Sequence, residues 1–254
     1  MSLSFNKKNA YTLSQHMTAL LIIFLILFGG IASPLYNLVQ KKQTVARLRL
    51  VYAEIVQAKK SFEITNEDSL DIYDTSLPAK EFAETYFSSM STKKVCESVQ
   101  SKCWKKLTYK DLSNSKMANN SEYSMVLENG TVFGFGKPDE NTVSLLVDLN
   151  GPSGVNKLGR DMFVFYFTND TLLPSLCSKE EYKKKHIRRG LHVGGYDKCG
   201  FPHDSYSYFE LLSKSLDGGC NKKGQKKSGD FGLGAACSAV IYLGNWDIER
   251  NYPW

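Results

Sequence analysis

The stretch MTALLIIFLILFGGIA, residues 17–32, carries no charged side chain, and ten of its residues are Leu, Ile or Phe. Such residues favour insertion near the centre of a bilayer by roughly 0.3 to 0.6 kcal/mol each, or about 3 to 6 kcal/mol for the set. The uncharged sequence extends on both sides, over residues 9–40. It therefore reaches the ~20 residues that a spanning helix needs, and we predict a membrane anchor.

Two other interpretations of residues 17–32 stay open. A cleaved secretory signal has an apolar core followed by small residues, which Gly29, Gly30, Ala32 and Ser33 would supply. A buried core helix is the other interpretation. A terminal run that is apolar on every side suits a bilayer better than a globular core, so the anchor is favoured.

The charges around the predicted span and the cysteines point to opposite orientations. Lys7 and Lys8 precede the span, and more cations follow it: Lys41, Lys42, Arg47 and Arg49. Counting positive charges alone places the following domain inside the cell. An even set of cysteines without a CxxC pair suits disulfides in an oxidising compartment better than zinc: Cys96, Cys103, Cys177, Cys199, Cys220 and Cys237. We expect the domain on the non-cytoplasmic side.

Residues 37–64 continue the helix with a different pattern. Apolar side chains recur at helical spacing, with Gln, Lys and Arg between them: Val45, Leu48, Val51, Tyr52, Ile55 and Phe62. Pro34 lies between the two halves and should kink the helix. From Thr12 to Ile64 the helix would be about 80 Å long. Its second half needs a globular partner to cover the apolar stripe.

A β-sheet is the expected partner. Residues 122–127 and 131–135 are rich in β-formers and flank Asn129-Gly130, the strongest short hairpin signal. A turn at Pro138-Asp139 and strands over residues 142–148 and 161–167 would follow. Such short connections predict an antiparallel meander that covers the helix stripe on one face. Short helices are expected over residues 81–90, 180–186 and 235–243.

The loop of residues 148–161 has two interpretations. Asp148, Asn150, Asn156 and Asp161 are oxygen donors, and the start Asp-x-Asn-Gly is typical of calcium loops. The EF-hand pattern then fails, because Pro152 occupies a ligand position. In the alternative, Asp and Asn cap backbone amides in a structural turn and no metal binds.

Several segments resemble a known family. KKNAYTL, residues 7–13, resembles the processing site of type IV prepilins and type II secretion pseudopilins: a basic leader, a small residue and an aromatic-Thr-Leu start to an apolar helix. Residues 36–45 and 148–161, together with CSAVI, NW and YPW within residues 237–254, look like a bacterial subgroup of these proteins. The matches are spread along the whole chain.

The resemblance implies an α+β fold in which a long N-terminal helix packs on an antiparallel sheet, stabilised by disulfides. It divides the chain into a leader (1–10), a transmembrane half-helix (11–36), an amphipathic half-helix (37–64) and a pilin-like globular domain (65–254). Cleavage by prepilin peptidase would follow Ala10 and leave Tyr11 to be methylated. Some pseudopilins also hold calcium in a nearby loop, which bears on residues 148–161.

Two positions depart from the family. Pilins prefer Gly where this chain has Ala10, and they usually carry Glu where it has Gln15. That Glu neutralises the N-terminal ammonium of a neighbouring subunit inside hydrocarbon. Gln15 can donate and accept hydrogen bonds but cannot neutralise a charge, so this assembly position points to a minor, initiating or non-assembling homologue.

The cysteine pairing stays open among fifteen connectivities. The short separation of Cys96 and Cys103 suits a local disulfide. A Cys220–Cys237 pair would resemble the C-terminal disulfide loop of pilins and contribute about 3 kcal/mol on the entropy model. Cys177 and Cys199 then remain for each other.

The resemblance implies a structural subunit of a type IV pilus or type II secretion system. It would lie in the bacterial inner membrane with a periplasmic domain, in some systems reaching the cell surface. Its partners would be copies of itself or other pilin-like subunits. The alternative is a permanently anchored extracytoplasmic binding module that does not polymerise. No catalytic motif suggests an enzyme, and the lysine runs lack the interleaved aromatics of a nucleic-acid groove.

Overall fold

The computed structural model describes residues 7–65, 73–97, 103–104, 109–117, 119–140, 142–168, 190–196, 201–224 and 231–254. Within the first of these ranges, the side chains of residues 7–16 and 25–33 are left out of the description. Contacts divide the chain into two compact units, Met1–Gln43 and Thr44–Trp254. Each unit is described by itself below.

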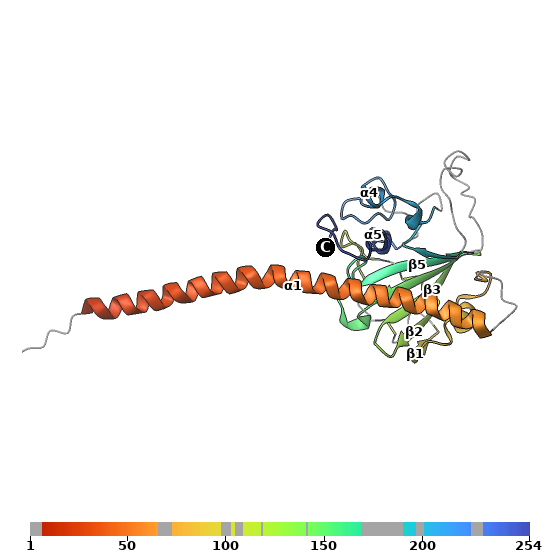
Figure 1. Cartoon of the computed structure of the whole chain (residues 1–254), viewed down its shortest axis with the longest axis horizontal. Helices are drawn as coiled ribbons and strands as arrows, with labels where there is room; N and C mark the ends of the chain where they lie inside the picture. Colours follow the sequence, from red (N-terminus) through yellow and green to blue (C-terminus); the bar gives the residue numbers. More distant parts are fainter. Residues whose placement is uncertain are drawn as a thin grey trace, which may run out of the picture. The chain divides into compact units, whose positions relative to one another are not determined.

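The first helix, α1 (Lys7–Thr65), is continuous through Pro34 (Figure 1). Proline therefore does not end this helix, although it supplies no backbone N–H. In the first unit, apolar side chains are 51 to 65% exposed: Met17, Leu20, Leu21, Ile22, Ile23 and Phe24. Among the side chains that the structure describes, no helical segment is both long and apolar enough to cross a membrane.

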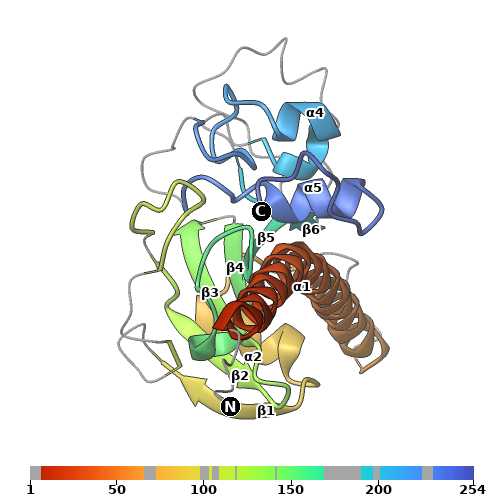
Figure 2. The same ribbon diagram turned by 90° about the vertical axis from the view of Figure 1, so that its left-hand side faces the viewer.

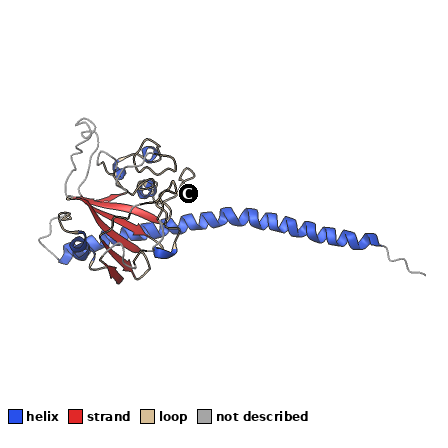
Figure 3. Cartoon of the chain, turned by 180° about the vertical axis from the view of Figure 1, so that it is seen from behind, coloured by secondary structure: helices blue, strands red, loops and turns tan. Residues whose placement is uncertain are grey.

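The second unit contains an antiparallel sheet, drawn in red in Figure 3. It has six strands, which follow one another in chain order. The strands are β1 (Thr92–Cys96), β2 (Tyr123–Leu127), β3 (Val132–Asp139), β4 (Thr142–Asp148), β5 (Met162–Thr168) and β6 (Gly190–Val193). The predicted meander is confirmed, and so is the α+β class. The bounds of β4 agree with the prediction, and β5 begins one residue later than predicted.

The β2–β3 hairpin forms around Asn129-Gly130 as predicted. Gly130 adopts φ +86°, a conformation that costs glycine little. The Asn129 side chain accepts a 3.0 Å hydrogen bond from the Thr131 amide, and Val126 pairs with Val132 at the base of the turn. The predicted turn at Pro138 is wrong: β3 continues to Asp139, which pairs with Thr142. The ladder shifts register between Gly136 and Asp139, where proline is tolerated in a sheet.

Both faces of the sheet are buried. Alternate side chains of β5 point to opposite sides because the strand period is two. Phe163, Phe165 and Phe167 join a core that contains Leu48, Val51 and Ile55 of α1. Val164 and Tyr166 join a second cluster with Trp104, Tyr196 and Phe231. The stripe of α1 therefore covers one face, as predicted, and chain segments outside the sheet cover the other.

Short helices complete the second unit. The helix α2 (Ala79–Phe87) lies where residues 81–90 were predicted, and α5 (Cys237–Leu243) ends at Gly244 as expected. Figure 2 shows α5 beside β5 and β6, and these elements are in contact. The structure adds α4 (Tyr208–Leu211), with a Ser207–Glu210 capping box, and the turns η1 (Gly151–Ser153) and η2 (His203–Ser205). The helix predicted over residues 180–186 lies outside the described residues.

Candidate functional site

The loop between β4 and β5 brings three of its four candidate metal ligands into the protein interior. Asp148, the last residue of β4, pairs with Met162, the first residue of β5. The Leu149 amide donates a 2.9 Å hydrogen bond to the Asp161 carbonyl, so the two carboxylates lie at the base of one loop. Asp148 is 0% exposed, and Asn156 and Asp161 are 3% exposed. Asn150 alone lies at the surface.

The carboxylate of Asp161 organises the loop backbone. Its Oδ2 accepts a 2.7 Å hydrogen bond from the Asn156 amide, and its Oδ1 accepts a 2.7 Å hydrogen bond from the Lys157 amide. A Cβ on Gly154 would lie 2.4 Å from Asp161 Oδ2, so this approach requires glycine. These contacts agree with the structural turn of the sequence analysis, in which Asp and Asn side chains cap backbone amides.

Asp148 is satisfied on one side only. Its Oδ1 accepts a 3.2 Å hydrogen bond from the Asn150 amide, while its buried Oδ2 has no hydrogen-bond partner in the described part of the chain. Burial, and secondarily the negative charge of Asp161, raise the pKa of Asp148 to about 8. The side-chain oxygen Oδ1 of Asn156 is likewise buried and without a hydrogen-bond partner among the described residues.

The second unit also ties this loop to α1. Arg47 of α1 donates from Nη1 to Oδ1 of Asn150. The side-chain oxygen of Asn150, a candidate metal ligand, is therefore already bound by the guanidinium of Arg47. Sequence reasoning counted Arg47 only as a charge flanking the span. No local pattern could have paired two exposed residues that are 103 positions apart.

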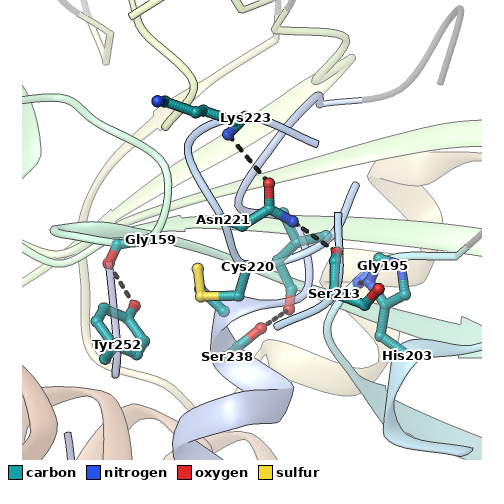
Figure 4. The surroundings of a disulfide bond; sticks show 11 residues. Gly159, Gly195, His203, Ser213, Cys220, Asn221, Lys223, Ser238 and Tyr252 are labelled. Carbon is teal, nitrogen blue, oxygen red and sulfur yellow. Dashed lines mark hydrogen bonds between the residues drawn. A yellow bond between two sulfur atoms is a disulfide. The ribbon is translucent and has the colours of Figure 1, made fainter. Parts of the chain in front are cut away.

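Residues near the C-terminus hold the other end of the loop (Figure 4). The hydroxyl of Tyr252 donates to the Gly159 carbonyl, and burial raises the pKa of Tyr252. The Arg160 guanidinium lies 5.0 Å from the Trp254 ring centroid, in the range of a cation–π contact. Lys222 Nζ donates a 2.9 Å hydrogen bond to the Trp254 carbonyl.

Two disulfides lie within the described residues. Cys96 bonds Cys103, and Cys220 bonds Cys237, the pairs expected from the sequence. The second disulfide adjoins the loop, because a Cβ on Gly159 would lie 2.7 Å from the Cys237 sulfur. Cys177 and Cys199, the third expected pair, lie outside the described residues.

The processing and assembly residues of the sequence analysis lie on the first turns of α1. Ala10, Tyr11 and Gln15 have helical backbone, and their side chains fall outside the described part of the structure. Nothing further is assigned to them from the fold. Their roles remain predictions from the family resemblance.

Two histidines, His192 and His203, have side chains that the structure describes, and both lie among structural contacts. His192 Nδ1 lies 3.1 Å from Asp204 Oδ1. His203 is fully buried, accepts a 3.0 Å hydrogen bond at Nδ1 from the Gly195 amide, and lies 3.0 Å from the Asp217 carbonyl through Nε2. Among the described residues, no three His, Cys, Asp or Glu side chains gather as a metal site.

A pocket of about 360 Å³ lies beside the C-terminal part of α1 in the second unit. It is bounded by α1, the turn after α2 and the β2–β3 turn, and its lining includes the carboxylates of Glu54 and Glu128. Burial raises the pKa of Glu54. Sequence reasoning missed this cavity, because its walls come from three distant segments.

No family model, curated protein or solved structure matches the chain.

Proposed function

We propose that the chain is a pilin-like or pseudopilin-like structural subunit of a type IV pilus or type II secretion system. Its α1 would anchor it in the bacterial inner membrane by a single pass and pack against α1 of other subunits. The second unit would lie in the periplasm and reach the cell surface where a filament is extended. The role is structural, and the chain is not proposed to be an enzyme.

The exposed apolar side chains of α1 are the observation that carries the proposal. Leu20, Leu21 and Phe24 are 57 to 64% exposed, and Leu35 and Tyr36 are 57 and 63% exposed. A helix with apolar side chains on every side is stable only in lipid or among other helices. A pilin-like subunit meets both environments, because its helix lies in lipid before assembly and among the helices of other subunits in a filament.

The second half of α1 supports the same proposal. Leu48, Val51 and Ile55 are at most 2% exposed and belong to the core of the sheet. In such a subunit, the C-terminal part of the assembly helix would belong to the core of the globular domain. The two disulfides of the described residues suit a periplasmic domain, because that compartment is oxidising.

A permanently anchored binding module is the second candidate. The pocket beside Glu54 favours it, because a binding module needs a concave site for its ligand. Gln15 favours it as well, since this residue cannot neutralise the ammonium of a neighbour. Such a module would keep residues 1–10 and would not polymerise.

The mass of the mature N-terminus separates the two candidates. The proposal expects loss of residues 1–10 by prepilin peptidase and an N-methylated Tyr11 in the protein purified from membranes. An A10D variant should keep Met1, because a charged residue at the cut does not suit a small-residue site, and A10G should be processed at least as fully. An intact Met1 in the wild-type chain would exclude the pilin-like proposal and favour the anchored module.

A further inference from the structure

The pocket of about 360 Å³ in the second unit combines acidic and apolar side chains. Its volume lies in the range of small-molecule sites. One wall is the C-terminal part of α1, the second is the segment after α2, and the third is the turn between β2 and β3. The lining includes Glu54, Ala58 and Ser61 of α1, together with Leu127 and Glu128.

Backbone hydrogen bonds fix two of these walls to each other. The Glu128 amide donates a 3.1 Å hydrogen bond to the Ser91 carbonyl, which joins the β2–β3 turn to the residue before β1. Within the turn, the side chain of Asn129 accepts a 3.0 Å hydrogen bond from the Thr131 amide. The two walls therefore do not have to be ordered by a ligand, and this lowers the cost of binding one.

The charged side chains of the pocket are all acidic. Among the described residues that line it, none is Lys, Arg or His. The Oε2 atom of Glu54 is buried and has no hydrogen-bond partner in the described part of the chain. Burial raises the pKa of Glu54, and no neighbouring charge among the described residues offsets this effect. Lys59 of the same helix bonds Glu63 at 3.1 Å and lies 5.2 Å from the Tyr73 ring centroid. A buried acceptor without a donor is unfavourable, so the pocket suits a cationic donor.

The buried part of the lining is apolar. Ala58 and Leu127 are 3% and 4% exposed. A second pocket, of about 210 Å³, shares Ala58 and Ser61 with the first and is also lined by Phe62 and Tyr86. Positions 54, 58, 61 and 62 fall on one side of a helix, because they are three, four, seven or eight residues apart. The concave surface therefore continues along α1 from an acidic end to an aromatic end.

We infer that this pocket binds an alkylammonium group, namely the lysine side chain of an extended peptide segment of a partner protein. Glu54 and Glu128 would supply the counter-charges, and the aliphatic stem would pack on Ala58 and Leu127. The flanking residues of the peptide would occupy the second pocket, about 12 Å further along α1. A compact ammonium matches the single buried oxygen of Glu54, whereas a guanidinium favours a fork of two acceptors. A metal ion is disfavoured, because no three His, Cys, Asp or Glu side chains gather in the described part of the chain.

This inference names a ligand class for the binding-module candidate, and it holds equally for a filament subunit. The mass of the mature N-terminus reports on processing, while the measurements below report on the pocket. Failure of one proposal therefore leaves the other intact.

Thermal unfolding of the full chain in detergent micelles tests the inference. N-acetyl-lysine amide at ~20 mM should raise Tm by about 4 °C, the shift expected for a Kd of about 1 mM. N-acetyl-norleucine amide has the same stem without the ammonium and should leave Tm unchanged. No rise with the lysine derivative, or an equal rise with the norleucine derivative, would overturn the inference.

n-Butylamine distinguishes a peptide from a free amine as the source of the ammonium. It carries the ammonium and the stem but no peptide groups, so it should raise Tm less than N-acetyl-lysine amide does. An equal or larger rise with n-butylamine would overturn the peptide source in favour of a free amine.

Matched variants locate the site. E54Q keeps the shape of the side chain and should abolish the rise with the lysine derivative. E81Q is the control, because it makes the same change of net charge at an exposed residue of α2 outside the pocket, and it should keep the rise. A full rise in E54Q would overturn the inference. If E54Q fails to fold, E128Q decides, because Glu128 is exposed. E128Q should reduce the rise, and a full rise in this variant would also overturn the inference.

Discussion

Arg47 of α1 donates a hydrogen bond to Asn150, the second residue after β4, across 103 positions of the sequence. The contact joins the end of the buried stripe of α1 to the loop that carries Asp148 and Asp161. It lies within the second unit, in which Leu48 is fully buried one residue further along the helix. Arg47 thus combines with the apolar stripe to fix where α1 meets the sheet.

The Arg47–Asn150 pair should show a measurable coupling energy. We expect R47Q and N150A each to destabilise the second unit, with a coupling of about 0.5 to 1.5 kcal/mol in a double-mutant cycle. Chemical denaturation measures it. R49Q, two residues away and exposed, is the control and should change stability by less than about 0.5 kcal/mol. Additive effects of R47Q and N150A would show that the contact does not contribute.

The buried stripe of α1 should dominate the stability of the second unit. Ile55 is 0% exposed, so I55A should lower the free energy of unfolding by about 2 to 5 kcal/mol through lost burial and a cavity. L50A on the same helix is the control, because Leu50 is 55% exposed and should change stability by no more than about 0.5 kcal/mol. Equal effects of the two variants in denaturant titrations would mean that the stripe does not pack as described.

Removal of the Tyr252 hydroxyl should loosen the end of the β4–β5 loop. Y252F leaves the ring buried but deprives the Gly159 carbonyl of its donor, at an expected cost of about 0.5 to 1.5 kcal/mol. Hydrogen exchange should quicken at residues 157–161, and Y36F, at a residue 63% exposed, should leave both quantities unchanged. Unaltered exchange in Y252F would contradict a holding role for this tail.

Asp148 should make the stability of the second unit depend on pH. Its pKa rises from 3.8 to about 8 on folding, so the folded state holds a proton that the unfolded state has lost between these values. Stability from this group is therefore present below about pH 4 and falls by up to about 1.4 kcal/mol per pH unit as pH rises towards 8. D148N removes this dependence. The variant should gain stability relative to wild type between about pH 5 and 8, and a constant difference would refute the assignment.

Local patterns predicted the elements whose causes are local. Asn129-Gly130 fixed the β2–β3 hairpin, and the periodic stripe at Leu48, Val51 and Ile55 predicted the covered face. The strand β1 was missed because Lys93 and Lys94 are exposed at the sheet edge, where lysine discourages pairing with other chains. Pro138 signalled a turn but lies at a register shift inside β3.

The candidate site could be predicted only in part. The residue types Asp148, Asn156 and Asp161 marked the loop as a donor cluster, and the structure buries all three. Two hydrogen bonds of the loop depend on the tertiary fold. They join Asn150 to Arg47 and Gly159 to Tyr252. Both partners come from segments that no short-range pattern connects to the loop.

The chain-order arrangement of the strands has a kinetic consequence. Every ladder joins consecutive strands, from β1–β2 to β5–β6. The connections from β2 to β5 are short, so this part of the sheet can grow without waiting for remote partners. Proteins with such local pairing fold faster than those that depend on long-range pairing. The stripe of α1 is synthesised before any strand, and its apolar side chains stay uncovered until the meander forms. Rapid sheet formation therefore shortens the interval in which the nascent chain is open to aggregation.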